Sequence, residues 1–350
     1  MNKLNIVNKY YFIIYILYYK LYILKMKVIN NDFSLILIML LKFILISILL
    51  ILLSIKKILT QVYDVEQIQK LNNYFDYFTY GKNLITEKME KQAGWILSSS
   101  HVLFLNGIIN YHKPKKCLEV GVADGGSSVL ILNSLEKIKD SILVSIDLNV
   151  NLYYDPEKKT GYRVNKYFPE LTKNWRLFTG DQPHKFLDKL NMKFDFVFLD
   201  TSHHSPGELI NIIEIMPFLN ENAIVVLHDI NLQLISQNIT LNYRPTQIYL
   251  MSSLFGDKIY VKNKDNAIEN IGAVILYKNQ QKHYLDYFLL LTTLWEYMPS
   301  ESQINDLRLF IKKYYKEDIY FDLFNLSVEK SKKFLNKYNK LIKSYNISLN

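Results

Sequence analysis

The chain has 350 residues, 49% of them hydrophobic, so it is long enough for one sizeable α/β domain with appendages and is not globally disordered. Its net charge of +9 is concentrated in residues 1–60, where eight lysines against Asp32 alone give +7. The remaining 290 residues carry only +2 and show no concentrated basic patch, which argues against a nucleic-acid-binding protein. Cys117 is the only cysteine, which excludes an intrachain disulfide and a cysteine-based zinc site.

Residues 33–55 form a predominantly apolar run of 23 residues in which Lys42 is the one charged residue. About 20 apolar residues suffice for a helix to cross a bilayer. Two lysines follow directly, which favours a cytoplasmic location for the domain that comes next, and the shorter aromatic stretch at residues 10–24 suits the membrane interface. We therefore predict a membrane-anchored protein with its hydrophobic helix within residues 1–60. The alternative is a hydrophobic helix packed on a partner protein.

Short β-rich apolar runs recur from residue 116 onward, and segments compatible with helices separate the first five of them. The runs are residues 116–120, 142–147, 175–179, 194–200, 223–228 and 271–278. Strands that alternate with helices in this rhythm predict an α/β fold, a Rossmann-like doubly wound and mostly parallel sheet with helices on both faces. We place this domain at residues 113–280, after a helical lead-in at residues 61–112 and before C-terminal helices at residues 281–350.

A glycine-rich turn follows the first of these runs, in the sequence Cys117-Leu-Glu-Val-Gly-Val-Ala-Asp-Gly-Gly-Ser-Ser128. Glycines such as Gly121 and Gly125 let a ligand approach the backbone closely, and ligands of open parallel sheets bind beyond the carboxyl ends of the strands. The second run ends in Asp147, whose carboxylate can accept both hydrogen bonds of a ribose diol. The turn therefore predicts a site for a cofactor that contains a ribose.

The residues of this turn alone are compatible with three functions: binding of NAD, binding of S-adenosylmethionine, or a structural role only. NAD and S-adenosylmethionine both contain a ribose, but the G-x-G-x-x-G pattern of dehydrogenases is missing, because Ala123 follows where its second glycine would be. A nicotinamide-dependent oxidoreductase is therefore the alternative to a protein that uses S-adenosylmethionine. A glycine-rich turn can also do no more than pack a helix on a sheet, which would suit a catalytically silent module linked to the membrane.

Polar residues follow two later runs at the carboxyl edge of the predicted sheet. Asp200 ends the fourth run and precedes His203, and the fifth run ends in His228 and Asp229. Neighbouring strands lie about 4.8 Å apart, so these side chains would converge on one small ion or substrate if the two strands are adjacent. Carboxylate oxygens suit Mg²⁺, and an imidazole shifts the preference toward Mn²⁺ or Zn²⁺. The aspartates could instead cap the helices that follow, with the histidines in solvated loops.

Together these motifs resemble those of class I S-adenosylmethionine-dependent methyltransferases, in the family that includes cephalosporin hydroxylase-like and macrolide-sugar O-methyltransferases. The resemblance covers about residues 95–280 and lies in Glu-x-Gly-x-x-x-Gly from Glu119, F-D-F-V-F-L-D-x-x-H up to His203, and V-V-L-H-D-I up to Ile230. It implies S-adenosylmethionine as the cofactor, with the first acid fixing the loop and the methionine ammonium. The implied cofactor-binding residues are Glu119, Gly121, Ala123, Gly125, Ser127, Asp147 and Asp181, the last of them meeting the adenine.

The resemblance further implies methyl transfer to a hydroxyl of a sugar, a glycan or another small molecule. Two mechanisms are open, because either a Mg²⁺ or Mn²⁺ ion activates the hydroxyl or a histidine removes its proton. The implied metal ligands are Asp200, His228 and Asp229, and we name Asp200 and His203 as the catalytic residues. His228 stands where the metal-dependent relatives have an acid, so metal dependence is left open. We expect the acceptor at the least regular segments, residues 150–168 and 231–256.

Overall fold

The computed structural model describes residues 81, 86–94, 97–231, 246–262 and 268–344, which belong to the compact unit Gln69–Asn350. The apolar segments at residues 10–24 and 33–55, on which the membrane prediction depends, lie outside this described part. Among the helices that the structure does describe, none is both long enough and apolar enough to cross a membrane. The predicted anchor therefore stays a prediction.

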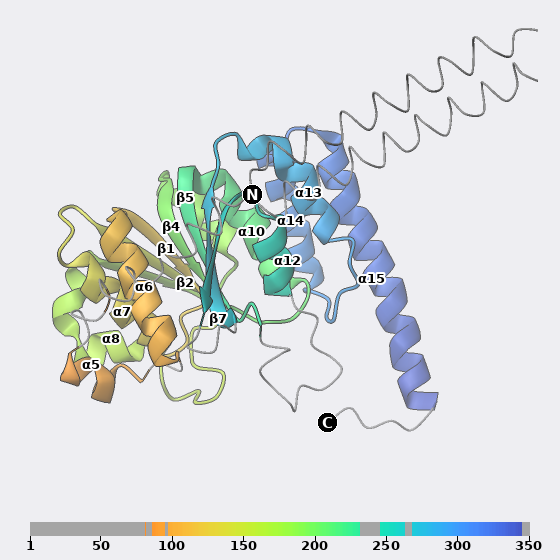
Figure 1. The fold of residues 1–350 in the computed structure, drawn as a ribbon. Coiled ribbons are helices and arrows are strands. Elements are labelled where there is room, and N and C mark those ends of the chain that lie inside the picture. The colour runs from red at the N-terminus through yellow and green to blue at the C-terminus, as the bar shows by residue number, and fades with distance from the viewer. Residues whose placement is uncertain (1–80, 82–85, 95–96, 232–245, 263–267, 345–350) are drawn as a thin grey trace, which may run out of the picture. The chain divides into compact units, whose positions relative to one another are not determined.

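A seven-stranded sheet forms the centre of the domain, in the order β3-β2-β1-β4-β5-β7-β6 (Figure 1). The strands are β1 Lys116–Val120, β2 Ile142–Asp147, β3 Trp175–Thr179, β4 Phe194–Leu199, β5 Leu219–His228, β6 Gly256–Lys262 and β7 Ile268–Leu276. The first five pair in parallel, whereas β7 is antiparallel to both β5 and β6. This topology confirms the predicted Rossmann-like, mostly parallel sheet, and β6 is a strand that the sequence analysis missed.

Helices cover both faces of the sheet, as the alternation of strands and helices predicts (Figure 1). One face packs against α5 Glu87–Gln92, α6 Ser99–His112, α7 Gly126–Leu135 and α8 Tyr162–Tyr167. The other packs against α9 Pro183–Leu190, α10 Gly207–Ile215, α12 Thr246–Ser253, α13 Tyr284–Leu290, α14 Glu301–Tyr314 and α15 Asp318–Ser344. Short 3-10 helices lie at Pro169–Asn174, Met216–Phe218 and Gln280–His283.

The central strands β4 and β5 are apolar on both sides because helices cover both sides. In β4, Phe196 and Phe198 face α6 and α7, whereas Val197 and Leu199 face α10, and all four side chains are fully buried. This two-sided burial aligns the strands so that their carboxyl ends open at one edge of the sheet, where ligands of such sheets bind.

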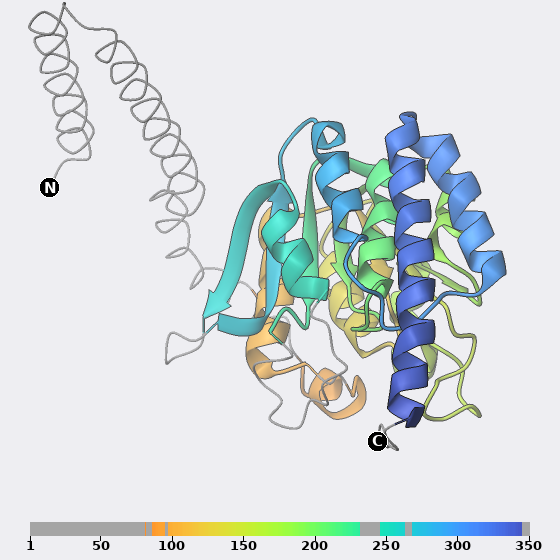
Figure 2. The ribbon, with the colours of Figure 1, turned by 90° about the vertical axis from the view of Figure 1, so that its right-hand side faces the viewer.

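The C-terminal helices pack into the same core as the sheet, and Figure 2 shows them, in blue, over the face on which α10 lies. Trp295, between α13 and α14, is completely buried, and so is Phe288 of α13. The hydroxyl of Tyr315 donates a hydrogen bond of 2.6 Å to the carbonyl of Ile213 in α10. The segment between α13 and α14 is thereby fixed next to the carboxyl edge of the sheet.

Candidate active site

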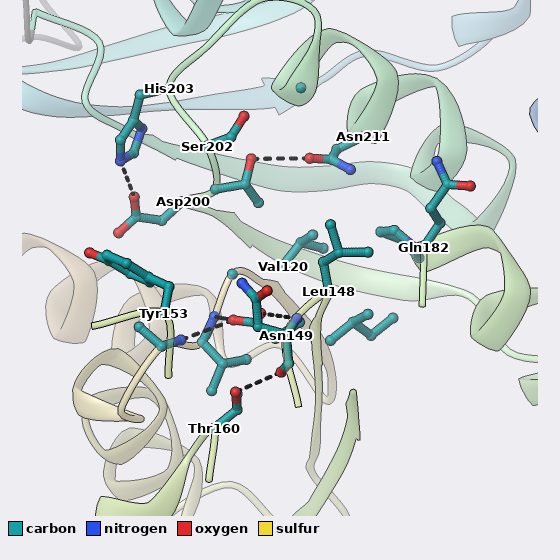
Figure 3. Close-up of a pocket in the computed structure, with 18 of the residues that line it drawn as sticks. Val120, Leu148, Asn149, Tyr153, Thr160, Gln182, Asp200, Ser202, His203 and Asn211 are labelled. Atoms are coloured by element: carbon teal, nitrogen blue, oxygen red, sulfur yellow. Dashed lines mark hydrogen bonds and ion pairs between the residues drawn. The ribbon is translucent and has the colours of Figure 1, made fainter. Parts of the chain in front are cut away.

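A cavity of about 740 Å³ opens at the carboxyl ends of β1, β2, β4 and β5 (Figure 3). Its wall includes the glycine-rich turn after β1, the end of β2, and the polar residues that follow β4 and β5. Four carboxylates and two imidazoles contribute to the lining: Asp124, Asp147, Asp200, Asp229, His203 and His228. The predicted cofactor turn and the predicted catalytic residues therefore share one cavity.

The glycine-rich turn depends on Gly121, whose φ of 89° lies in the left-handed region. A Cβ atom at this position would lie 1.7 Å from the carbonyl oxygen of Asp200. The close approach is reinforced by the amide of Asp200, which donates to the carbonyl of Val120 at 3.0 Å. No side chain fits here, so a glycine is required to bring the turn and the end of β4 together. Gly125, Ala123 and Ser127 also lie on this turn, and of these Ala123 and Ser127 line the cavity.

Asp147 at the end of β2 holds the turn from the side. Its Oδ2 accepts the amides of Val122 at 2.9 Å and Ala123 at 3.0 Å, and its Oδ1 accepts the amide of Asn149 at 2.8 Å. The carboxylate also lines the cavity, and an ionised carboxylate has about four acceptor positions, so capacity is left for a ligand. Its contact with a ribose stays a prediction.

Glu119 lies beneath the turn, fully buried. Its carboxylate accepts hydrogen bonds from the hydroxyls of Ser127 at 2.7 Å, Ser128 at 2.6 Å and Ser145 at 2.6 Å. Burial raises the pKa of Glu119 to about 7, although the three hydroxyls act in the opposite direction. Glu119 therefore ties the start of α7 to β2. It is not one of the residues that line the cavity, so this geometry lends no support to a contact with the methionine ammonium.

Asp181 and its neighbour Gln182 follow β3, where the adenine contact is predicted. The Asp181 side chain is 41% exposed and lies 3.4 Å from Lys185 Nζ, and it is not part of the cavity wall. Gln182 is buried in that wall, and its Oε1 has no hydrogen-bond partner within the described part of the chain. A buried carbonyl oxygen without a partner is unfavourable, so this atom is available to a ligand. Gln182 is thus a second candidate for the adenine contact, and the predicted contact of Asp181 stays a prediction.

The strand-end residues meet as an ion-paired cluster. Nε2 of His203 lies 3.0 Å from Asp229 Oδ2 and 3.6 Å from Asp200 Oδ1, and Figure 3 shows the latter pair. Nδ1 of His228 lies 3.1 Å from the same Asp229 oxygen and 3.5 Å from Asp200 Oδ2. Asp200 and His203 follow β4, and His228 and Asp229 end β5. Because β4 and β5 are neighbours in the sheet, these two pairs of residues meet although up to 29 positions separate them in sequence.

The carboxylates hold both imidazoles in the protonated form at neutral pH. Burial alone would lower the pKa of His203, but Glu208, Asp200 and Asp229 outweigh it and raise the pKa to about 9. Burial likewise acts against His228, whose pKa Asp200 and Asp229 raise to about 10. Burial would raise the pKa of Asp229, yet the two imidazoles lower it. Both imidazoles are therefore cationic at neutral pH, next to the carboxylates that raise their pKa values.

A second layer of polar residues orients this cluster, and none of its members was predicted. His101 of α6 approaches His228 Nε2 with its Nδ1 at 3.1 Å and Glu269 Oε2 with its Nε2 at 3.3 Å. Burial, followed by the nearby His228, lowers the pKa of His101 to about 4. Glu208, fully buried at the start of α10, accepts the backbone amide of His203. His101 lies 127 positions before His228, so no local pattern reveals it, whereas Glu208 follows His203 by only five residues.

Asp200, His203 and Asp229 form a group that could hold a metal ion, because one ligand atom of each lies within 4.8 Å of the others. Two carboxylate oxygens and an imidazole nitrogen suit Mn²⁺ or Zn²⁺ better than Mg²⁺. His228 is not in this group, although its Nδ1 lies 3.5 Å from Asp200 Oδ2 and 3.1 Å from Asp229 Oδ2. The predicted set with His228 thus differs from the set that the geometry brings together, which contains His203 instead.

The segment between α13 and α14 completes the cavity from outside the predicted domain. Tyr297 and Gln303 line the cavity near the loop that carries His203. The neighbouring Glu296 fixes this loop, because its amide donates to the carbonyl of Ser205 at 2.8 Å and its Oε2 accepts the Ser205 amide at 2.7 Å. On the opposite side, Tyr153 lines the cavity from the irregular segment at residues 150–168.

Residues 118–230 match a family model described as a methyltransferase domain. The match runs from β1 to the end of β5 and so contains the glycine-rich turn, Asp147 and the whole strand-end cluster. Residues 118–230 therefore carry a methyltransferase domain, and a nicotinamide-dependent oxidoreductase is not favoured. S-adenosylmethionine is the cofactor that the sequence motifs predict for this domain.

Solved structures with a similar arrangement include three methyltransferases. The O-methyltransferase TomG from Streptomyces achromogenes, in complex with S-adenosylmethionine, is 15% identical, with 55% of this chain and 91% of that chain covered and a TM-score of 0.42. The S-adenosylhomocysteine-bound Podospora anserina methyltransferase PaMTH1 is 15% identical, with 62% and 97% covered and a TM-score of 0.40. The O-methyltransferase from Bacillus cereus is 12% identical, with 63% and 97% covered and a TM-score of 0.39. A comparison with curated proteins gives no match.

The methyltransferase's contact with adenine can be assigned by comparing two adjacent side chains. We expect Gln182→Ala to weaken binding of S-adenosylhomocysteine about tenfold, because a buried hydrogen-bonding group is lost from the cavity wall. Asp181→Ala is the matched control, and its dissociation constant should stay within about twofold of wild type. Titration calorimetry on the full-length chain measures both. Loss of binding in the Asp181 variant alone would show that Asp181, and not Gln182, contacts the adenine.

Proposed function

We propose that this methyltransferase methylates a hydroxyl group of a sugar or another small molecule. The observation that supports an oxygen acceptor is the convergence of Asp200, His203 and Asp229 in the cavity that also contains the glycine-rich turn. A hydroxyl oxygen must lose its proton to become a methyl ether, and this cluster offers groups that can take it. The polar walls at Ser202 and Gln303 suit the other hydroxyls of such an acceptor.

Methyl transfer from a sulfonium is an in-line displacement, so the protein has to align donor and acceptor and remove one proton. We assign the removal of the proton to the neutral form of His203. Its Nε2 points between Asp200 and Asp229, and these carboxylates would stabilise the imidazolium that forms. Glu208 beneath it, which accepts the His203 amide, keeps the ring in place.

A divalent ion is compatible with the same residues, since Asp200, His203 and Asp229 offer three ligand atoms close enough to share it. When bound, such an ion would supply positive charge that lowers the pKa of an acceptor hydroxyl. We therefore propose metal assistance as the second form of the mechanism, with Mn²⁺ favoured over Mg²⁺ because of the imidazole.

The strand-end acids should be needed for turnover but not for cofactor binding. Asp200→Asn and Asp229→Asn should each lower turnover about a hundredfold, because proton removal and its stabilisation depend on these carboxylates. Binding of S-adenosylhomocysteine should change little, since the turn is held by Asp147 and Glu119 instead. Methyl transfer to a panel of sugars and phenols, together with calorimetry, measures the two effects.

The same assay separates the two forms of the mechanism. Loss of turnover in a chelator and its recovery with Mn²⁺ would support metal assistance. Turnover that a chelator does not affect would leave His203 as the base. If the Asp200→Asn, Asp229→Asn double variant keeps wild-type turnover, both forms are wrong, and the two acids serve only the structure.

The pH dependence of turnover tests His203 directly. Because the pKa of His203 is about 9, only a small fraction of the rings is neutral at pH 7. This neutral fraction grows about tenfold with each pH unit until the pH reaches the pKa. With chelator present, turnover should therefore rise between pH 7 and pH 9. The stabilising effect of the protonated ring has the opposite sign, because it is complete below pH 6.5 and is lost as the pH rises through about 9. His203→Asn should remove the rise in turnover, whereas His204→Asn should retain it.

We also propose that residues 33–55 anchor the enzyme in a membrane, with the methyltransferase domain in the cytoplasm and a membrane-proximal glycan among the candidate acceptors. The length and apolar character of the run and the lysines that follow it support this proposal. The full-length chain should stay with membranes after carbonate extraction, and deletion of residues 1–57 should release it. Recovery of the full-length chain in the soluble fraction would contradict the anchor.

A further inference from the structure

Arg163, the second residue of α8, does not line the cavity but contacts two segments that do. One is the glycine-rich turn, through Asp124. The other is the lead-in segment, by which we mean residues 86–94 together with Leu97, a cavity residue. The two segments are separated by α6 and β1 in sequence, and the guanidinium group of Arg163 lies at the place where they meet.

The contact with the turn fixes the orientation of a cavity carboxylate. Nε of Arg163 donates to Asp124 Oδ2 at 2.7 Å, and the backbone amide of Arg163 donates to the Asp124 carbonyl at 3.0 Å. The other carboxylate oxygen, Oδ1, accepts the amide of Gly126 at 3.1 Å, where α7 begins. Asp124 is thus held from both sides, with one of its two oxygens bound to an arginine from outside the turn.

The contact with the lead-in segment uses the same guanidinium group. Its Nη1 atom donates to the backbone carbonyl of Gln92 at 3.1 Å. The group also lies directly against Gly94, where a Cβ atom would come within 2.2 Å of Arg163 Cζ. The lead-in segment is further attached to the body by Met89 and Ala93, which are buried in the core beside α8.

We propose that Arg163 is a positioning residue that couples cofactor binding to the docking of the lead-in segment. The guanidinium group of Arg163 binds both Asp124 in the turn and Gln92 in the lead-in segment. The part of the cavity wall at Asp124 and the part at Leu97, which belongs to the lead-in segment, therefore form together. A cofactor that binds the assembled wall must therefore stabilise the docked segment, and the docked segment must raise cofactor affinity by the same factor. The proposal rests on the use of S-adenosylmethionine, and the experiment distinguishes failure of that assignment from failure of the coupling.

An ordinary exposed ion pair would not have this effect, since such pairs contribute little. Here the side chains of Arg163 and Asp124 are 24% and 13% exposed, and the guanidinium is bound through two different nitrogen atoms to two segments. If Arg163 acted on the cofactor through its charge alone, its removal would have the opposite effect on cofactor affinity. Without the arginine, the Asp124 carboxylate would attract the ammonium group of the cofactor more strongly, and binding would become tighter.

The experiment is a double-mutant cycle of Arg163→Met and Gly94→Ala in the full-length chain, with the dissociation constant of S-adenosylhomocysteine as the readout. Arg163→Met should weaken binding about tenfold, because the charge-assisted hydrogen bond that holds Asp124 in the cavity wall is lost. Gly94→Ala displaces the guanidinium without altering a cavity residue, and it should weaken binding several-fold in the protein that retains Arg163. In the Arg163→Met background it should change binding less than about twofold. An alanine at φ 61° still strains the lead-in segment there, but without Arg163 that strain no longer affects the cavity wall at Asp124.

Arg308→Met is the matched control. Arg308 of α14 also donates through Nε and Nη1, to Asn325 and Asn305, each at 2.8 Å, but neither it nor its two partners line the cavity. Its removal should leave the dissociation constant unchanged. Hydrogen exchange provides the second readout, in which the cofactor product should slow exchange of residues 86–94 in wild type but not in Arg163→Met.

Each outcome decides the proposal. Additive losses in the cycle, unchanged binding or tighter binding in Arg163→Met would overturn the coupling while leaving the methyltransferase assignment intact. The same holds if the cofactor product protects residues 86–94 equally in both proteins. Absence of binding by the wild-type chain would overturn the cofactor assignment and the coupling with it.

Discussion

The contact between Gly121 and the backbone of Asp200 is the constraint on which the site depends. The left-handed turn at Gly121 places the cofactor loop against the end of β4, at a distance that excludes any Cβ atom. The glycine-rich turn and the strand-end acid Asp200 are therefore parts of one backbone arrangement. The parallel pairing of β1 with β4, buried on both faces, maintains this contact.

Around this contact the protein concentrates buried charge, and each charge is compensated locally. Glu119 is surrounded by three serine hydroxyls, and the strand-end carboxylates are paired with the imidazoles of His203 and His228. Burial without such partners would drive these groups to their neutral forms. Against the effect of burial, the pairing raises the pKa values of both imidazoles and lowers that of Asp229, whereas the hydroxyls around Glu119 only partly offset its burial. The need for such partners explains why segments outside the motifs contribute polar side chains here.

Most of the fold could be predicted because the five parallel strands are covered on both sides, so that their sequences are continuous apolar runs. β6 was missed since this edge strand begins with glycine and two adjacent charged residues, Asp257 and Lys258, which leaves only three apolar or aromatic residues in a row. In the site, the strand-end residues were found because each follows a recognisable strand. The choice between Asp181 and Gln182 depends on burial, which cannot be read from a turn sequence. His101 depends on a contact between distant segments, which no local pattern records, whereas Glu208 lies close to His203 in sequence and its role depends on its burial.

The cavity wall is divided along the sequence. The residues that hold the cofactor turn lie within the stretch 118–230 that matches the methyltransferase family, whereas Tyr297 and Gln303 lie beyond it in the C-terminal helices. Substitutions in the second group can alter the shape and polarity of the wall while the hydrogen bonds around Gly121 and Asp147 stay as they are. Under the proposed function, the part of the cavity at residues 297–303 can therefore vary with the acceptor while the turn that is predicted to bind the methyl donor is preserved.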